Sequence, residues 1–192
     1  VWHAAQFVTE IQGGSDVGAN AVEARPAAGG AYTLHGPKWF CSNVNADYFL
    51  VSARPAGAPQ GARGVAIFLV PAHLDDGAPA RNGHTIDRLK DKLGTRELAT
   101  AELTFDGALA WPIGPLDRGL ANLVDLVLVT SRMACVLYAA ASLRQAERTV
   151  RAYTAFRTAF GRPIVDYAPV RRTVDEIALA RERALAVAVE LV

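Results

Sequence analysis

Glycine and proline divide this chain into two unlike parts. They repeatedly interrupt residues 1–112, whereas residues 120–160 contain neither. Because these residues are the strongest local breakers of regular structure, the first part can hold only short segments, and the second can hold long helices. We therefore expect an α+β fold in which a β domain over residues 1–112 precedes a helical domain over residues 113–192.

Short runs rich in β-branched and aromatic residues occur throughout the first part, as is typical of strands. Segments 21–25 and 31–35 alternate polar and apolar residues around a turn at 26–30, which predicts a β-hairpin. Further strands are expected at residues 48–53, 64–70, 85–89 and 99–105. Strands of this number and length predict a small antiparallel β-barrel or sandwich.

The second part has apolar residues at helical spacing, among them Leu123, Val127 and Leu137. At ~1.5 Å per residue, residues 120–160 span about 60 Å, so one very long helix and two helices with a break are both compatible with the pattern. Gly161 is placed to end a helix, and Pro169 to begin the next. The segment predicts the first helices of a bundle. Since residues 185–192 carry no capping glycine or proline and the first residue is not Met, we expect a truncated helical domain from a longer protein.

Composition excludes several classes of protein. With 51% hydrophobic and 20% charged residues the chain is an ordinary globular sequence. Its longest strongly apolar stretch, residues 120–129, falls short of the ~20 residues of a membrane span, so no membrane segment is expected. A net charge of +1 lacks the basic footprint of nucleic-acid binding. Cys41 and Cys135 fit neither a disulfide framework nor a metal site, which favours a cytoplasmic protein without a metal.

Residues 7–16, with the sequence Phe-Val-Thr-Glu-Ile-Gln-Gly-Gly-Ser-Asp, join a strand to a loop. The adjacent glycines let the backbone approach a ligand closely. The hydroxyls of Thr9 and Ser15 suit a carbonyl-rich heterocycle or a phosphate. A serine or Asx turn at the end of a strand explains the same residues without any ligand, and on this segment alone we prefer the turn.

Four motifs give this loop a context. Thr-Glu and Gly-Ser-Asp lie within residues 9–16, Gly-Pro-Lys-Trp-Phe-Cys-Ser at 36–42, Lys-Leu-Gly-Thr-Arg at 92–96, and Arg-Thr-Ala-Phe-Gly at 157–161. Their order resembles that of the flavin-dependent acyl-CoA dehydrogenases over nearly the whole chain. Residues 88–94 are most similar to the AidB-like branch of that family.

The resemblance implies an FAD site. Thr9 would hydrogen-bond the flavin pyrimidine edge, Ser42 would place its hydroxyl at flavin N5, and Phe40 would lie against the isoalloxazine ring. Without the other motifs, Phe40 and Ser42 would be an ordinary strand pair, one buried and one in a turn. The expected cofactor-binding residues are Phe7, Val8, Thr9, Gly14, Ser15, Phe40, Cys41, Ser42, Arg157 and Phe160.

Arg157 and Phe160 resemble family residues that reach across a subunit boundary to the FAD pyrophosphate and adenine. A guanidinium suits bidentate contact with phosphate, although a solvated arginine at a helix end explains Arg157 equally well in isolation. The resemblance therefore implies a homo-oligomer, a dimer or a tetramer. Ser15 and Arg132 would lie near an acyl-CoA or a related small molecule.

The implied reaction is α,β-dehydrogenation of an acyl-CoA thioester with hydride transfer to flavin N5. It needs a general base, normally a carboxylate, which we expect beyond Val192, so this chain by itself is expected to be inactive. The alternative is a protective, DNA-associated flavoprotein of the AidB-like kind. Its basic face would draw on the arginines at positions 144, 148, 151, 157, 162, 171 and 172.

Overall fold

The structure is a computed structural model that describes residues 1–74 and 80–190. The chain forms two compact units, Val1–Val124 and Asp125–Val192. The first is built of strands and the second of helices, which confirms the predicted α+β class.

The first unit is a closed β-barrel, because its strands pair in the cyclic order β4, β2, β3, β7, β5 and back to β4. These strands are β2 (Glu23–Pro26), β3 (Tyr32–Ser42), β4 (Tyr48–Pro55), β5 (Ala66–Pro71) and β7 (Thr100–Pro112). The hairpin predicted around residues 26–30 is confirmed, since β2 and β3 pair antiparallel with Glu23 opposite His35.

Two strands pair with the barrel from outside the ring. β1 (Ala4–Phe7) runs parallel to the first half of β4, and β6 (His84–Leu89) runs antiparallel to β7. β2 also runs parallel to β4, so parallel pairs accompany the antiparallel ones that the sequence predicts. Three short 3₁₀ turns complete the unit: Val17–Ala19, Ala28–Gly30 and Ala62–Gly64.

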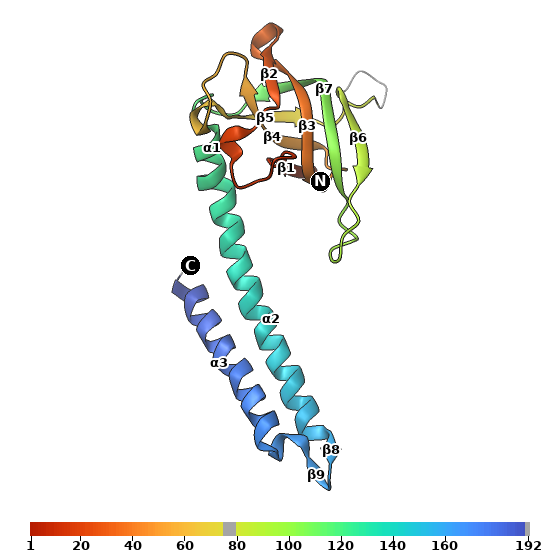
Figure 1. Ribbon diagram of the computed structural model, residues 1–192, viewed down its shortest axis with the longest axis vertical. Helices are drawn as coiled ribbons and strands as arrows, with labels where there is room; N and C mark the ends of the chain where they lie inside the picture. Colours follow the sequence, from red (N-terminus) through yellow and green to blue (C-terminus); the bar gives the residue numbers. More distant parts are fainter. Residues whose placement is uncertain (75–79, 191–192) are drawn as a thin grey trace. The chain divides into compact units, whose positions relative to one another are not determined.

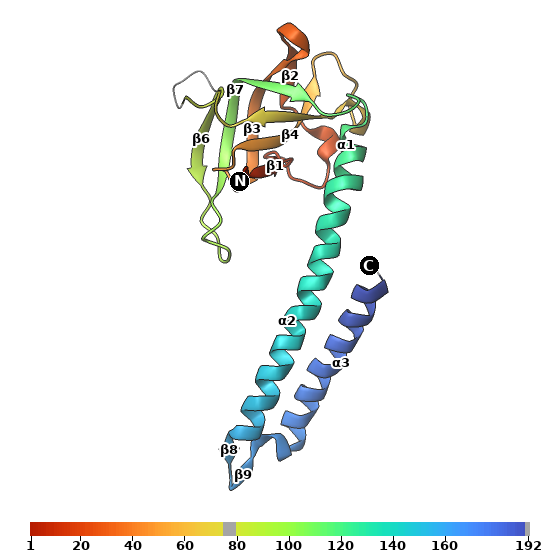
Figure 2. The same ribbon diagram turned by 180° about the vertical axis from the view of Figure 1, so that it is seen from behind.

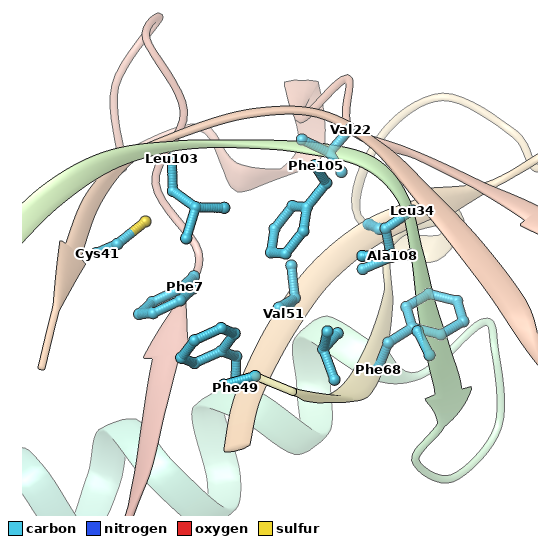
Figure 3. Close-up of a cluster of buried hydrophobic side chains, with 14 of the residues drawn as sticks. Phe7, Val22, Leu34, Cys41, Phe49, Val51, Phe68, Leu103, Phe105 and Ala108 are labelled. Atoms are coloured by element: carbon cyan, nitrogen blue, oxygen red, sulfur yellow. The ribbon is translucent and has the colours of Figure 1, made fainter. Parts of the chain in front are cut away.

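Aromatic side chains fill the barrel (Figure 3). Phe7 and Phe49 are fully buried, and their ring centroids lie 4.5 Å apart. Phe68 and Phe105 are buried further along the core. Because burying one such side chain contributes about 1.5–3 kcal/mol, this core is sufficient to fix the positions of the strands around it.

The second unit is a helical hairpin in which α2 (Val129–Phe156) and α3 (Ala168–Glu190) lie side by side (Figures 1 and 2). A short α1 (Gly119–Asn122) and a π-helical stretch (Leu123–Leu128) precede α2 without interruption. Of the two alternatives that the sequence left open, the structure has one long helix, with a π-helical stretch near its start.

The prediction that Gly161 ends this helix is wrong. α2 stops at Phe156, where Arg157 becomes extended, and Gly161 lies in the turn of a small hairpin. That hairpin comprises β8 (Thr158–Ala159) and β9 (Arg162–Pro163), and a 3₁₀ turn (Ile164–Asp166) connects it to α3. With φ of +80°, Gly161 serves the turn, for which glycine carries no steric penalty. Pro169 is near the start of α3, as predicted.

The continuous helix from Gly119 to Phe156 is long and apolar enough to cross a membrane. One 18-residue window has a mean hydropathy of 1.7, and 6% of that window is buried. The sequence argument considered only residues 120–129, and the apolar residues that follow make the window longer. A core helix of a soluble protein passes the same test, so the absence of a membrane segment stays a prediction.

Candidate functional site

A buried ion pair anchors the loop that follows β1. Lys38 on β3 and Glu10 in the loop are both buried, and the Lys38 Nζ lies 2.8 Å from Glu10 Oε1. The Glu10 carboxylate also accepts hydrogen bonds from the backbone N–H groups of Ala21 at 2.7 Å and Val22 at 3.1 Å. Each charge is therefore compensated, as burial requires.

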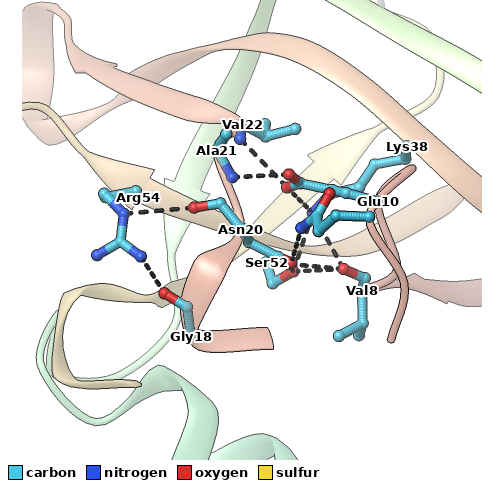
Figure 4. Close-up of polar contacts among 10 residues, drawn as sticks. Val8, Glu10, Gly18, Asn20, Ala21, Val22, Lys38, Ser52 and Arg54 are labelled. Carbon is cyan, nitrogen blue, oxygen red and sulfur yellow. Dashed lines mark hydrogen bonds and ion pairs between the residues drawn. The ribbon is translucent and has the colours of Figure 1, made fainter. Parts of the chain in front are cut away.

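The Val8 carbonyl oxygen is the second anchor of this loop (Figure 4). It accepts hydrogen bonds from Asn20 Nδ2 at 2.7 Å, Lys38 Nζ at 3.2 Å and Ser52 Oγ at 3.2 Å. The residues on both sides of Thr9 are thus tied to the barrel. The backbone carbonyl of Thr9 itself accepts a hydrogen bond from the Trp39 N–H at 2.9 Å, which holds the loop beside β3.

Burial lowers the pKa of Lys38 to about 8, and the Glu10 carboxylate opposes that shift. The ion pair is thus maintained against a substantial desolvation cost. This cost indicates that the geometry around Thr9 depends on both partners being present.

Gly14 packs directly on the hydroxyl of Thr9. A Cβ at this glycine would lie 2.9 Å from Thr9 Oγ1, closer than such contacts normally come. Ser15 follows on the exposed side of the loop. The structure therefore brings Thr9, Gly14 and Ser15 together in one loop, as the sequence predicts.

An extra residue in β3 places Phe40 and Ser42 on the outer face. Lys38 pairs with Leu103 and Cys41 with Ala101, so β3 holds one more residue than β7 between these pairs. This bulge reverses the alternation: Lys38 and Cys41 are buried, while Phe40 is 53% exposed and Ser42 is exposed. The alternative of an ordinary strand pair, in which one of Phe40 and Ser42 is buried, is therefore wrong.

Cys41 and Phe7 point into the core instead of toward a ligand (Figure 3). Burial raises the pKa of the Cys41 thiol to about 12, which favours the neutral thiol over the reactive thiolate. Any contact of these two residues with a cofactor would be made by the backbone.

A cationic layer lies beneath the aromatic pair Trp39 and Phe40. The Lys90 Nζ is 3.4 Å from the Trp39 ring centroid and 4.6 Å from that of Phe40. It also forms an ion pair with Glu102 at 2.6 Å, which Arg88 joins from the same strand edge. Hydrogen bonds from Arg88 and then Lys90 lower the pKa of Glu102 to about 2. The aromatic surface therefore rests on fixed positive charge.

The other predicted site residues belong to the helical unit. Arg132 is exposed on α2, and Arg157 is exposed at its end. Phe160 lies at the tip of the β8–β9 hairpin, 97% exposed, with φ of +50°. Tyr167 supports this tip, because its hydroxyl donates to the Ala159 carbonyl at 2.7 Å and its ring lies 6.2 Å from that of Phe160. An aromatic side chain is thus held outside the unit's own fold.

Sequence reasoning named the exposed residues of this candidate site but not the residues that support them. Lys38 and Ser52 were assigned no role, and neither were Lys90 and Thr100. One signal was available: from Leu34 the alternation of β3 places Lys38 on the inner face, and a lysine there requires a carboxylate partner.

Comparisons with known proteins place the chain among relatives of one kind. A family model described as the acyl-CoA dehydrogenase middle domain matches residues 5–108. AidB of Escherichia coli is 36% identical over 175 residues, covering 91% of this chain and 31% of that protein. Acyl-CoA dehydrogenase family member 11 of Caenorhabditis elegans is 39% identical over 168 residues, covering 83% of this chain and 26% of that protein.

The solved structures agree with the sequence relatives. The crystal structure of Caenorhabditis elegans ACDH-11 in complex with C11-CoA has a TM-score of 0.85 and 32% identity, covering 98% of this chain and 34% of that one. The chain spans less than a third of the length of the two curated relatives, at 31% and 26%.

Proposed function

This chain belongs to the acyl-CoA dehydrogenase family, and on that premise we propose that the protein containing it is an FAD-dependent oxidoreductase that dehydrogenates an acyl-CoA thioester between its α and β carbons. The supporting observation is the surface formed by the Thr9 loop and the outer face of β3. There the exposed Phe40 ring and the hydroxyls of Thr9 and Ser42 lie on neighbouring segments, since the Thr9 carbonyl accepts a hydrogen bond from the Trp39 N–H.

The residues of this surface fit FAD. The Phe40 ring is 53% exposed and can lie against an isoalloxazine, and the hydroxyls of Thr9 and Ser42 can donate to ring nitrogen or carbonyl acceptors. The absence of a side chain at Gly14 leaves space for the Thr9 hydroxyl, because a Cβ there would lie 2.9 Å from Thr9 Oγ1. When bound, FAD supplies the hydride acceptor, and the protein supplies binding and orientation.

Each residue of the surface has a task in this proposal. Phe40 would cover one face of the flavin ring, while Thr9 would hydrogen-bond its pyrimidine edge and the Ser42 hydroxyl would reach N5. The ion pair of Lys38 and Glu10 holds the Thr9 loop against movement. Ser15 lies on the exposed side of the same loop, where an acyl-CoA can reach it.

The helical unit completes the proposal. Arg157 and Phe160 contact the FAD pyrophosphate and adenine of a neighbouring subunit in a homo-oligomer, a role that suits an aromatic ring held at a hairpin tip. Arg132 contacts the acyl-CoA. In this proposal the general base comes from a part of the full-length protein outside this chain, which spans 31% and 26% of its two curated relatives. The proposed location of the protein is the cytoplasm.

The test is the visible absorption spectrum of the full-length protein before and after anaerobic addition of acyl-CoA thioesters. The panel spans short to long chains and includes an eleven-carbon thioester, because the ACDH-11 structure contains C11-CoA. We expect a bound-flavin spectrum that bleaches with at least one thioester. A protein that binds no flavin after reconstitution contradicts the cofactor assignment, and a flavin that no thioester bleaches contradicts the reaction.

A second candidate function is protective DNA binding. The exposed arginines of the helical unit favour it; Arg144 and Arg148 lie on one face of α2, four residues apart. Binding of this kind weakens steeply with salt. A flavin that stays oxidised with every thioester, together with salt-dependent binding of duplex DNA that Arg144→Gln and Arg148→Gln weaken, would favour this function over the first.

A further inference from the structure

A chain of three polar side chains ends at Ser42. Ser42 on β3 and Thr100 on β7 are register partners, and their side-chain oxygens lie 3.0 Å apart. The Lys92 Nζ, from the loop between β6 and β7, lies 3.0 Å from Thr100 Oγ1. Lys92 is held there by two further contacts, to the Leu98 carbonyl at 2.6 Å and to Thr95 Oγ1 at 3.4 Å.

The chemistry of Lys92 fixes the direction of this chain. An ammonium group has three donors and no acceptor, so Thr100 Oγ1 must accept from Lys92. The single hydroxyl hydrogen of Thr100 can then go to Ser42 Oγ at 3.0 Å or to the Leu98 carbonyl at 3.5 Å. The Leu98 carbonyl already accepts from Lys92 at the shorter distance, and Ser42 is the closer acceptor. Thr100 therefore donates to Ser42.

The consequence is a free hydrogen on Ser42. Its oxygen accepts from Thr100, and no other hydrogen bond of its side chain occurs within residues 1–74 and 80–190. Ser42 is exposed, whereas Thr100 is 4% exposed beneath it. The hydroxyl hydrogen is thus available to an acceptor outside the barrel.

We propose that Lys92 and Thr100 are positioning residues that orient the Ser42 hydroxyl as a donor to flavin N5. This inference rests on the proposed function, because it needs FAD on the surface beside Ser42. The oxidised N5 carries a lone pair and accepts hydrogen bonds, so a donor oriented in advance suits it. A positive charge at the far end of the chain polarises both hydroxyls and strengthens the terminal bond.

The test compares the affinity of the full-length apoprotein for FAD and for 5-deaza-FAD, measured by fluorescence titration. The analogue has a C–H group in place of N5 and cannot accept this hydrogen bond. We expect the wild-type protein to prefer FAD by about tenfold, the magnitude of one net hydrogen bond. Ser42→Ala should remove the preference. Thr100→Val and Lys92→Met should reduce it to about threefold, because the Ser42 hydroxyl stays but loses its orientation.

Conservative variants separate this role from a structural one. Thr100→Ser and Lys92→Arg keep the hydroxyl and the charged donor, so both should retain the wild-type preference. Glu97→Gln removes a charge from the same loop, where Glu97 makes no side-chain hydrogen bond or ion pair within the described residues, and it should also retain the preference. If Lys92→Met fails to fold by circular dichroism, the comparison of Thr100→Val with Thr100→Ser decides.

Three outcomes overturn the inference at different levels. The first outcome is a loss of the preference for FAD in Ser42→Ala, with the tenfold preference unchanged in both Lys92→Met and Thr100→Val. It would contradict the positioning roles of Lys92 and Thr100 and would still support the contact of Ser42 with N5. Equal wild-type affinity for the two flavins removes the N5 contact and leaves the cofactor. Failure of the wild-type protein to bind either flavin overturns the proposed function itself.

Discussion

The β unit and the helical unit bury their apolar side chains to very different extents. In the β unit the aromatic residues of the core, such as Phe7 and Phe49, have no exposed surface. Among the described residues of the helical unit, only Ala140, Thr154, Val174 and Ala188 are buried, and all are of small or medium size. Larger side chains there are exposed, including Leu185 at 48% and Phe156 at 83%.

This difference shows that the two units are stabilised in different ways. The barrel buries its large apolar side chains within itself, and the Glu10 carboxylate pairs with the buried Lys38 inside it. The described residues of the helices bury few apolar side chains against one another and leave larger ones, such as Leu185, exposed. The candidate site follows the same division: the loop around Thr9 is held by hydrogen bonds within the β unit, whereas Phe160 extends from a hairpin tip.

The largest expected effect tests the contrast in packing. Phe49→Ala should destabilise the β unit by about 4 kcal/mol, because it leaves a cavity beside Phe7. Leu185→Ala, the matched change in the helical unit, should cost under about 1 kcal/mol, since half of that side chain is exposed. Urea unfolding measured by tryptophan fluorescence and by circular dichroism at 222 nm gives both values. Equal losses in the free energy of unfolding for the two variants would contradict the difference in packing between the two units.

The buried ion pair should give the next largest effect. Lys38→Met leaves the Glu10 carboxylate buried without its cation and should destabilise the β unit by about 3 kcal/mol. The double variant Lys38→Met with Glu10→Gln should recover part of this loss. Arg25→Met, at the exposed pair with Glu23, should change stability by less than about 1 kcal/mol. The chain's three tryptophans all lie in the β unit, so their fluorescence reports this transition.

The fold was largely predictable from local sequence, and the supports of the site were not. The hairpin around residues 26–30 and the start of α3 near Pro169 follow from turn and capping chemistry, which acts over a few residues. The bulge that turns Phe40 outward depends on the pairing of β3 with β7, some 60 residues away. The contact of Lys92 with Thr100 likewise depends on a loop closing beside a strand, which no local pattern encodes.

A smaller effect should separate binding from folding. Gly14→Ala places a Cβ against Thr9 Oγ1 and displaces that hydroxyl, so the full-length protein should bind FAD about tenfold more weakly. Its free energy of unfolding should change by less than about 0.5 kcal/mol, because the loop is exposed there. Gly94→Ala meets no atom within 4 Å and should leave FAD affinity unchanged. Unaltered affinity in Gly14→Ala would mean that Thr9 does not contact the cofactor.

The smallest effect concerns acid stability at the β6–β7 edge. Arg88 and Lys90 hold the pKa of Glu102 at about 2, below its ordinary value of 4.5. Because the folded-state pKa is depressed, the stabilisation is complete above pH 4.5 and is lost as the pH falls from 4.5 toward 2. Glu102→Gln should therefore flatten the pH dependence of β-unit stability in this window, measured by urea unfolding followed by tryptophan fluorescence. Glu97→Gln, in the loop between β6 and β7 and without an ion pair among the described residues, should leave the slope intact. If both variants keep the wild-type slope, Arg88 and Lys90 do not hold the pKa of Glu102 below its ordinary value, and the contact of Lys90 with the Trp39 ring does not depend on Glu102.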